Sequence, residues 1–433
     1  MAAAKVVVEK PWWKERDLWI VLLAAWAARA AFIRLLPAAA YSSDTDSWMR
    51  MWQTLSSGGN PYTTPPCLPY PPLWIQIVFV LGKTRAWTGL SFVLLLRLLL
   101  IGFESALIVA TWELTKRTAP HARRLPLFLA GMSLNPIAIL IVCQHGQFDV
   151  LVALWIVLML LSLVRFNESR DALDWLLACV FLGLAILTKT VPLILAPLAF
   201  LGTGGLSRKA RVLGWLFILG PVTLGLSVIY VLAPDAVAAN VIGFRSLPGW
   251  FGITGILLIL GEPAAARAYQ SLYPLAALGT VIVLSIAAYR GWKLANAGIA
   301  LIALTLLVSV PLLGTGYGPQ YIFWSIPPAV ACALGFGPFW KWLTIGCFAV
   351  AIVTYVFEYA ICPSHGMFLV RMFPESAALV QMSRTWSDQA HQTLARLPWF
   401  FALAWFFASA VRILARAPAA APTAAGPSVR AKK

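Results

Sequence analysis

The apolar segments of this chain set the strongest limit on its fold, because many are close to the length that crosses a bilayer. Runs such as 18–36, 147–164 and 212–232 hold few charges, and about 20 apolar residues in a helix span the hydrocarbon core. Of the 433 residues, 61% are hydrophobic and only 11% are charged, whereas soluble domains carry roughly 25% charged residues. Strands of a membrane barrel would instead alternate over about ten residues. The sequence therefore predicts an all-α polytopic membrane protein.

Basic residues orient the predicted helices, because loops rich in Lys and Arg stay in the cytoplasm. Segments 2–17, 116–124 and 202–211 are basic and are predicted to be cytoplasmic. This bias requires the short apolar stretches 73–81 and 250–260 to enter the membrane without crossing it. About twelve crossing helices follow, within a range of 11–13, and both termini are cytoplasmic. The predicted spans are 18–36, 89–115, 125–143, 147–164, 175–188, 191–201, 212–232, 271–289, 294–313, 321–337, 342–359 and 397–415. The pair 175–188 and 191–201 has a re-entrant hairpin as its alternative.

Five regions follow from this topology. They are a cytoplasmic N-terminus at 1–17, a transmembrane module at 18–232 that includes an external catalytic loop at 37–88, an external loop with a re-entrant segment at 233–270, a variable transmembrane module at 271–415, and a disordered basic tail at 416–433. The six cysteines show no metal-ligand spacing, although Cys67 and Cys362 could form an external bridge. Cytoplasmic loops account for the high basic content, so no nucleic acid partner is expected.

The most unusual loop runs from residue 41 to residue 74. Asp44 and Asp46 stand two apart just after the first span. Apolar side chains then recur at spacings of three and four from 45 to 55, which predicts a short amphipathic helix on the membrane surface. The sequence Gly-Gly-Asn-Pro at 58–61 ends this helix, and a proline-rich return follows. The loop therefore combines two acids with a rigid backbone, which is typical of a site.

Several sequence pieces resemble motifs of GT-C glycosyltransferases, which take a sugar from a polyprenyl-phosphate carrier. The acid pair resembles the D-x-D or D-x-E of their first external loop, and 59–62 with 70–73 resembles a G-x-P-Y…Y-P-P signature of bacterial and archaeal mannosyltransferase-like members. Four further matches follow in order along the chain. They are Arg97 with Glu104, the HGQFD segment at 145–149, Lys189 with Pro192 and Pro197, and the GPQYIFW segment at 318–324; the first two of these resemble the N-glycan-pathway glucosyltransferases.

This resemblance implies a GT-C fold with its site at the outer membrane face. It implies Asp44 and Asp46 as candidate catalytic residues. Candidate substrate-binding residues are Arg50, Tyr62, Tyr70, Arg97, Glu104, His145, Gln147, Asp149, Lys189, Arg245, Gln320 and Tyr321. The chemistry agrees, because an acceptor hydroxyl needs a base and a departing lipid phosphate needs cations or hydrogen-bond donors. Attack opposite the phosphate would invert the anomeric carbon.

Each candidate also has a purely structural interpretation. Asp44 and Asp46 could cap the surface helix and complement its dipole. Arg97 and Glu104 lie two turns apart, about 10 Å along a helix, so each would need a partner on another helix and could belong to a structural network. His145 could end a helix, and Lys189 could reach out to the membrane surface rather than meet phosphate.

The residues and this resemblance together predict an inverting hexosyltransferase in the inner or plasma membrane, with its site facing the periplasm or exterior. The resemblance alone implies mannose as the sugar. The donor is a polyprenyl-phosphate-linked sugar, and the acceptor is a glycolipid, a glycan or a protein. No cofactor is specified, and Mg²⁺ or Mn²⁺ at the two acids stays open. A transporter or lipid-linked glycan flippase is one alternative, although no internal repeat is visible. A glycan ligase or polymerase of similar architecture is another.

Overall fold

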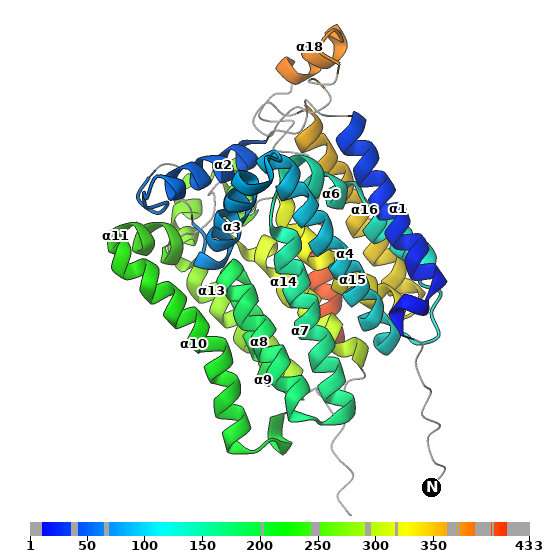
Figure 1. Ribbon diagram of the computed structural model, residues 1–433. Coiled ribbons are helices and arrows are strands. Elements are labelled where there is room, and N and C mark those ends of the chain that lie inside the picture. The colour runs from blue at the N-terminus through cyan, green and yellow to red at the C-terminus, as the bar shows by residue number, and fades with distance from the viewer. Residues whose placement is uncertain are drawn as a thin grey trace, which may run out of the picture.

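The computed structural model describes residues 11–35, 42–64, 69–200, 203–243, 252–290, 296–316, 319–361, 370, 373–385, 400 and 402–413. Every regular element in these ranges is a helix (Figure 1), which confirms the all-α fold. The helices are α1 (Arg16–Leu35), α2 (Ser43–Ser56), α3 (Pro72–Thr88), α4 (Phe92–Thr118), α5 (Leu125–Phe128), α6 (Pro136–Leu140), α7 (Asp149–Ser169), α8 (Ala172–Thr188), α9 (Ala196–Phe200), α10 (Arg208–Leu232), α11 (Pro234–Val237), α12 (Gly252–Ile259), α13 (Pro263–Arg290), α14 (Asn296–Leu313), α15 (Ile326–Gly335), α16 (Pro338–Ile361) and α18 (Ala377–Thr385).

Seven helical segments of the described chain are long and apolar enough to cross a membrane. They are Arg16–Leu35, Phe92–Thr118, Leu125–His145, Asp149–Ser169, Arg208–Leu232, Asn296–Leu313 and Pro338–Val356. Two shorter apolar helices, Ala172–Thr188 and Ala402–Ile413, accompany them. The chain is therefore an integral multi-pass membrane protein, and the count of twelve spans stays a prediction.

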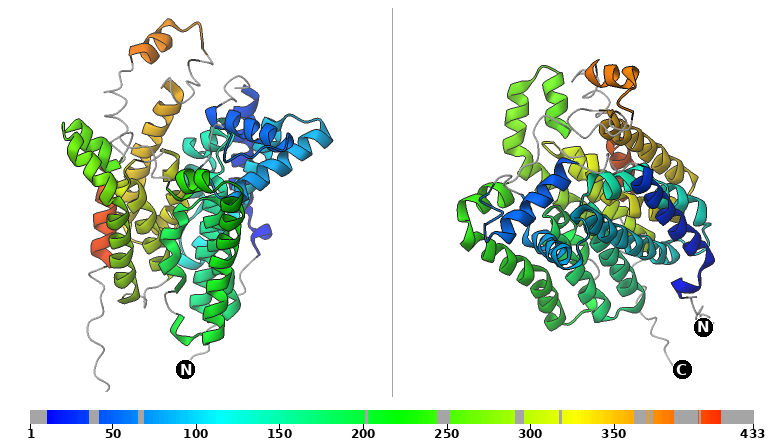
Figure 2. Two further views of the ribbon diagram at one scale, coloured as in Figure 1. Left: turned by 90° about the vertical axis from the view of Figure 1, so that its left-hand side faces the viewer. Right: turned by 45° about the horizontal axis from the view of Figure 1, so that its top comes forward.

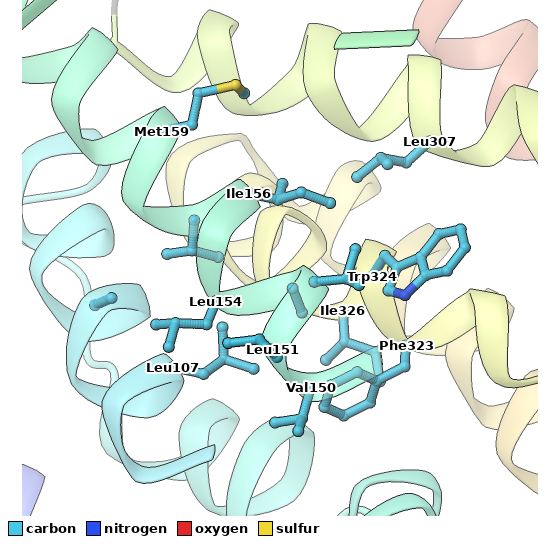
Figure 3. Packing of buried hydrophobic residues seen from close by; sticks show 14 of the residues in the cluster. Leu107, Val150, Leu151, Leu154, Ile156, Met159, Leu307, Phe323, Trp324 and Ile326 are labelled. Atoms are coloured by element: carbon cyan, nitrogen blue, oxygen red, sulfur yellow. The ribbon is translucent and has the colours of Figure 1, made fainter. Parts of the chain in front are cut away.

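Helix α7 forms the centre of the bundle. It packs against α4 and α8, and 83% of its apolar span is buried, compared with 17% for α10. Figure 3 shows how its side chains interdigitate with those of α4 and α14, including Leu151 against Leu107 and Ile156 near Leu307. Because lipid tails are as apolar as leucine, such close packing rather than water exclusion holds the helices together. The central helix therefore provides a rigid support for the residues at its first turn.

Small residues let α8 and α10 approach closely. A methyl group added at Gly183 would stand 2.8 Å from the carbonyl oxygen of Phe217, and one at Gly214 would enter the ring of Trp175. Backbones that touch in this way gain van der Waals contact, which is the main attraction between helices in a membrane. This pairing fixes the end of α8, where Lys189 lies.

A buried arginine stabilises a break in the segment 125–145. Pro136 has no N–H, and the N–H of Ile137 donates to the side chain of Asn135 at 2.9 Å, so the carbonyls of Met132 and Ser133 lose their usual helical partners. Arg29 on α1 donates to both carbonyls. Its Nε also donates to Oε2 of Glu104 at 2.8 Å, which neutralises both charges at membrane depth. Glu104 therefore does meet a partner on another helix.

The two helices of the first loop lie over one end of the bundle. The predicted surface helix at 45–55 is α2, and α3 lies across the long helices rather than along them (Figure 2, left). Helix α3 runs to Thr88 and is longer than the predicted stretch 73–81, because Lys83 and Arg85 are good helix formers and the helix ends only at Gly89, whose φ is +72°. At the far end of the bundle, Arg117 of α4 contacts Glu168 of α7.

Candidate active site

Asp44 lies in the first turn of α2 and contacts His145. The N-cap of α2 is Ser42, whose side chain accepts from the backbone N–H of Thr45 at 3.1 Å, so neither acid caps the helix. Oδ2 of Asp44 instead meets Nε2 of His145. The side chain of Asp44 keeps 25% of its surface exposed, whereas that of His145 keeps 6%. The carboxylate is therefore held on one side and remains accessible on another.

The turn that carries His145 is tied to α2 through its backbone. The hydroxyl of Ser42 donates to the carbonyl of His145 at 2.6 Å, and Nε1 of Trp48 donates to the carbonyl of Gly146 at 3.0 Å. Gly146 has a φ of +66°, and a Cβ there would stand 2.9 Å from Oγ1 of Thr45. Glycine is required here for both reasons, and the close approach brings the imidazole to Asp44.

Asp44 carries a negative charge at neutral pH. Burial alone would raise the pKa of Asp44, but its contact with His145, a hydrogen bond from Gln147 and the charge of Lys189 leave that pKa below its ordinary value of 3.8. An ionised carboxylate with one accessible side can accept a proton from a bound hydroxyl. The site therefore holds a candidate general base.

Lys189 lies at the C-terminal end of α8, beside Asp149 at the start of α7. Its Nζ is 2.9 Å from Oδ1 of Asp149, which is fully buried. The same Nζ stands over the rings of Tyr321 at 4.4 Å and Trp324 at 4.7 Å. The amine is thus held between a carboxylate and aromatic faces.

Aromatic rings enclose the space between these groups. Phe148 stacks on Trp74 with ring centroids 4.6 Å apart and meets Tyr70 edge to face at 4.9 Å. Burial raises the pKa of Tyr70, as do the charges of Asp44, Tyr321 and Asp149, so its hydroxyl stays protonated and able to donate. A low-dielectric surround strengthens every charge contact inside it.

The structure gathers seven of the predicted residues at one end of the bundle. They are Asp44, Tyr70, His145, Gln147, Asp149, Lys189 and Tyr321. Tyr62 supports this group from behind, because its buried hydroxyl donates to the carbonyl of Tyr70 at 3.1 Å, and Gln320 precedes Tyr321 in the 3-10 helix η8 (Pro319–Ser325).

The other predicted residues lie elsewhere. Asp46 and Arg50 are exposed on α2. Arg97 is buried in α4, and Glu104 pairs with Arg29. Arg245, Cys67 and Cys362 lie outside the described residues. Within the described ranges, no group of three or more His, Cys, Asp or Glu side chains is placed to hold a metal ion, and Mg²⁺ or Mn²⁺ stays an open alternative.

Sequence reasoning missed two contributors to the site. Trp324 stands in the segment 318–324 that carries one of the motif matches, but the resemblance does not imply it as a site residue. Tyr355 of α16 contacts His145 from a region of the chain without any recognised motif. Its signal was weak, since a tyrosine in an apolar helix usually marks a membrane interface.

An apolar cleft of about 650 Å³ adjoins this end of the bundle. It lies between α10 and the two flanks of the proline-rich loop, and its lining includes Tyr62, Pro72, Leu187 and Val228. Tyr62 belongs to this lining and also donates to the carbonyl of Tyr70, so the cleft adjoins the back of the site. An elongated apolar ligand could occupy it.

The fold is the GT-C fold of polytopic membrane proteins, as comparison with solved structures shows. The chain is similar to ArnT from Cupriavidus metallidurans, whose crystal structure was determined with bound undecaprenyl phosphate. The TM-score is 0.53 at 15% sequence identity, over 92% of this chain and 77% of the ArnT chain. No protein-family model matches the sequence, and no curated protein sequence matches it either. At this identity the likeness defines the fold.

Proposed function

We propose that this protein is an inverting glycosyltransferase that moves a hexose from a polyprenyl-phosphate carrier to a hydroxyl acceptor. The observation that carries the proposal is the joining of an ionised, accessible carboxylate, Asp44, with a buried cation, Lys189, in one aromatic-lined site. Transfer of a sugar from a lipid phosphate needs one base and one phosphate clamp. The site supplies both groups in a GT-C fold.

Asp44 takes the proton of the acceptor hydroxyl, and the hydroxyl oxygen attacks the anomeric carbon as the bond to the carrier phosphate breaks. Lys189 stabilises the charge that develops on the leaving phosphate oxygen. Phosphate would compete with Asp149 for Lys189, and Arg245 is a second proposed phosphate ligand. His145, Gln147 and Tyr70 orient the carboxylate and the sugar.

The apolar cleft supports a lipid-borne donor. A nucleotide sugar would have no use for an apolar cleft of about 650 Å³ behind the site, whereas an isoprenoid chain would gain burial there. The bound undecaprenyl phosphate of ArnT agrees with this class of carrier. Mannose as the sugar rests on the motif resemblance alone, and a glycolipid, a glycan and a protein remain the candidate acceptors.

A transfer assay tests the proposal directly. Purified protein is mixed with a panel of short-chain polyprenyl-phosphate hexoses carrying a radioactive sugar, and with a membrane fraction from cells that lack the gene. We expect label to move from the short-chain lipid to a new acceptor, with polyprenyl phosphate as the co-product. Movement of the intact labelled lipid between leaflets without sugar release would support a flippase instead. Transfer of a preassembled glycan with no transfer of single sugars would support the ligase.

We further propose that the site faces the periplasm or exterior. The far ends of α4 and α7 carry basic residues, including Lys116, Arg117 and Arg170, and the start of α10 adds Arg208. Loops of this kind remain in the cytoplasm. The site lies at the opposite end of α4, beside α2 (Figure 1).

Thiol labelling tests this orientation. Single cysteines are placed at Gln53 of α2 and at His121 after α4, both exposed, in a cysteine-free background. We expect a membrane-impermeant maleimide to label position 53 on intact cells and to label position 121 only after the cells are opened. The reverse pattern would place the site in the cytoplasm.

A further inference from the structure

Both ring nitrogens of His145 have partners at fixed positions. Nε2 meets Oδ2 of Asp44, and Nδ1 is 3.2 Å from the hydroxyl of Tyr355. Because an ionised carboxylate only accepts, Nε2 must carry the hydrogen in this contact. In the neutral ring Nδ1 is then an acceptor, and the phenol is a donor at the right distance.

Tyr355 is well placed to hold the ring. It is fully buried on α16, a helix that packs against α6 and η8. Helix α6 leads into the turn that carries His145, and η8 carries Tyr321. Helix α16 therefore supports both sides of the site, although Tyr355 is 210 residues away from His145 in the sequence.

We propose that Tyr355 is a positioning residue for the base, which acts by donating its hydroxyl hydrogen to Nδ1 of His145 and so aims Nε2–H at Asp44. This inference rests on the proposed function, since it assigns a role within that site. A carboxylate whose second oxygen is fixed presents the first oxygen to the acceptor in a defined direction. Partners that orient a histidine through its other nitrogen act in this way in metal sites.

The effect on turnover follows from the strength of one hydrogen bond. Tyr355→Phe keeps the ring and removes the hydroxyl, and we expect kcat to fall about three- to tenfold, the range that one ordinary hydrogen bond supports. KM for a short-chain polyprenyl-phosphate hexose should not change, because Tyr355 contacts His145 rather than the cation at Lys189. Thr344→Val is a matched control. It removes a buried hydroxyl from the same helix, one that donates to the carbonyl of Trp340 at 2.7 Å.

A histidine spectrum reads the contact without any need for turnover. The chain has four histidines, and protein labelled with ¹⁵N-histidine gives a His145 signal that is identified by its loss in His145→Gln. In Tyr355→Phe we expect the Nδ1 resonance of His145 to move toward the position of a ring nitrogen that accepts no hydrogen bond. In Thr344→Val it should stay unchanged. An unmoved Nδ1 resonance in Tyr355→Phe would overturn the proposal. If the resonance moves in Tyr355→Phe but the wild-type protein transfers no sugar, the result would count against the proposed function alone.

A double-mutant cycle separates positioning from general support of the fold. If Tyr355 acts through His145, then adding Tyr355→Phe to His145→Gln should lower kcat no further. A full additional loss in that background would mean that the tyrosine acts on the fold instead, and would overturn the proposal. If His145→Gln has no measurable turnover, the spectrum decides.

Discussion

We expect the Asp44→Asn variant to lose at least about 99% of wild-type turnover, because a positioned general base contributes about 10²–10⁴ in rate. Asparagine has nearly the same shape, and its carbonyl oxygen can still accept from Nε2 of His145, so the fold should survive. Its amide cannot take a proton from the acceptor. The initial rate of labelled sugar transfer measures the loss, and donor binding measured by tryptophan fluorescence should remain within about threefold of the wild-type value.

Asp46→Asn is the matched control for this prediction. Asp46 lies in the same turn of α2 but is exposed, so its replacement should change the rate by less than about threefold. If Asp44→Asn kept more than about a tenth of wild-type turnover, the base would lie elsewhere, because removing a base that contributes about 10² or more lowers the rate by at least that factor. A large loss in Asp46→Asn with a small one in Asp44→Asn would exchange the roles of the two acids.

Lys189→Met should have two effects of different origin. It should weaken donor binding by about 10- to 100-fold, because a hydrogen bond to a charged group contributes about 1.5–3 kcal/mol. It should also lower the unfolding free energy by about 3–5 kcal/mol, because Asp149 is left as an uncompensated buried charge. Thermal unfolding in detergent and titration with short-chain polyprenyl phosphate measure the two effects separately.

The double variant Asp149→Asn/Lys189→Met separates phosphate binding from structural pairing. It removes both charges, so most of the lost stability should return. Donor affinity should stay as low as in the single variant, because the cation is still absent. Recovery of donor affinity together with stability would show that Lys189 is only the structural partner of Asp149, and Arg245 would then be the main candidate for the phosphate.

The first external loop shows what local pattern can specify. The spacing of apolar residues from 45 to 55 predicted α2 within two residues at each end, because residues three and four apart lie on the same face of a helix. The motif resemblance identified Asp44 and His145 as separate candidates. It could not pair them, because their contact depends on a glycine turn that only the packed structure brings against α2.

Charges inside the membrane show the limit of such patterns. The sequence predicted that Glu104 needs a partner on another helix, yet Arg29 was not assigned to it. The pairing depends on which helix faces α4 and on the break before Pro136, which frees carbonyls for the same arginine. Neighbours across helices are set by packing over the whole bundle, so spacing along one helix does not reveal them.

The sequence by itself determined that this chain is a helical membrane protein, which segments are apolar, and which loop carries the acids. These properties follow from composition and from short periodicities, and a bilayer accepts few alternatives to helices. Only the tertiary structure decided that Asp44 rather than Asp46 faces the site, that Lys189 pairs with Asp149, and that Tyr355 reaches His145 across 210 residues. Each of these contacts depends on how separate helices are rotated and placed in depth relative to one another. Close packing of side chains from several segments fixes this arrangement, so no single segment reveals it.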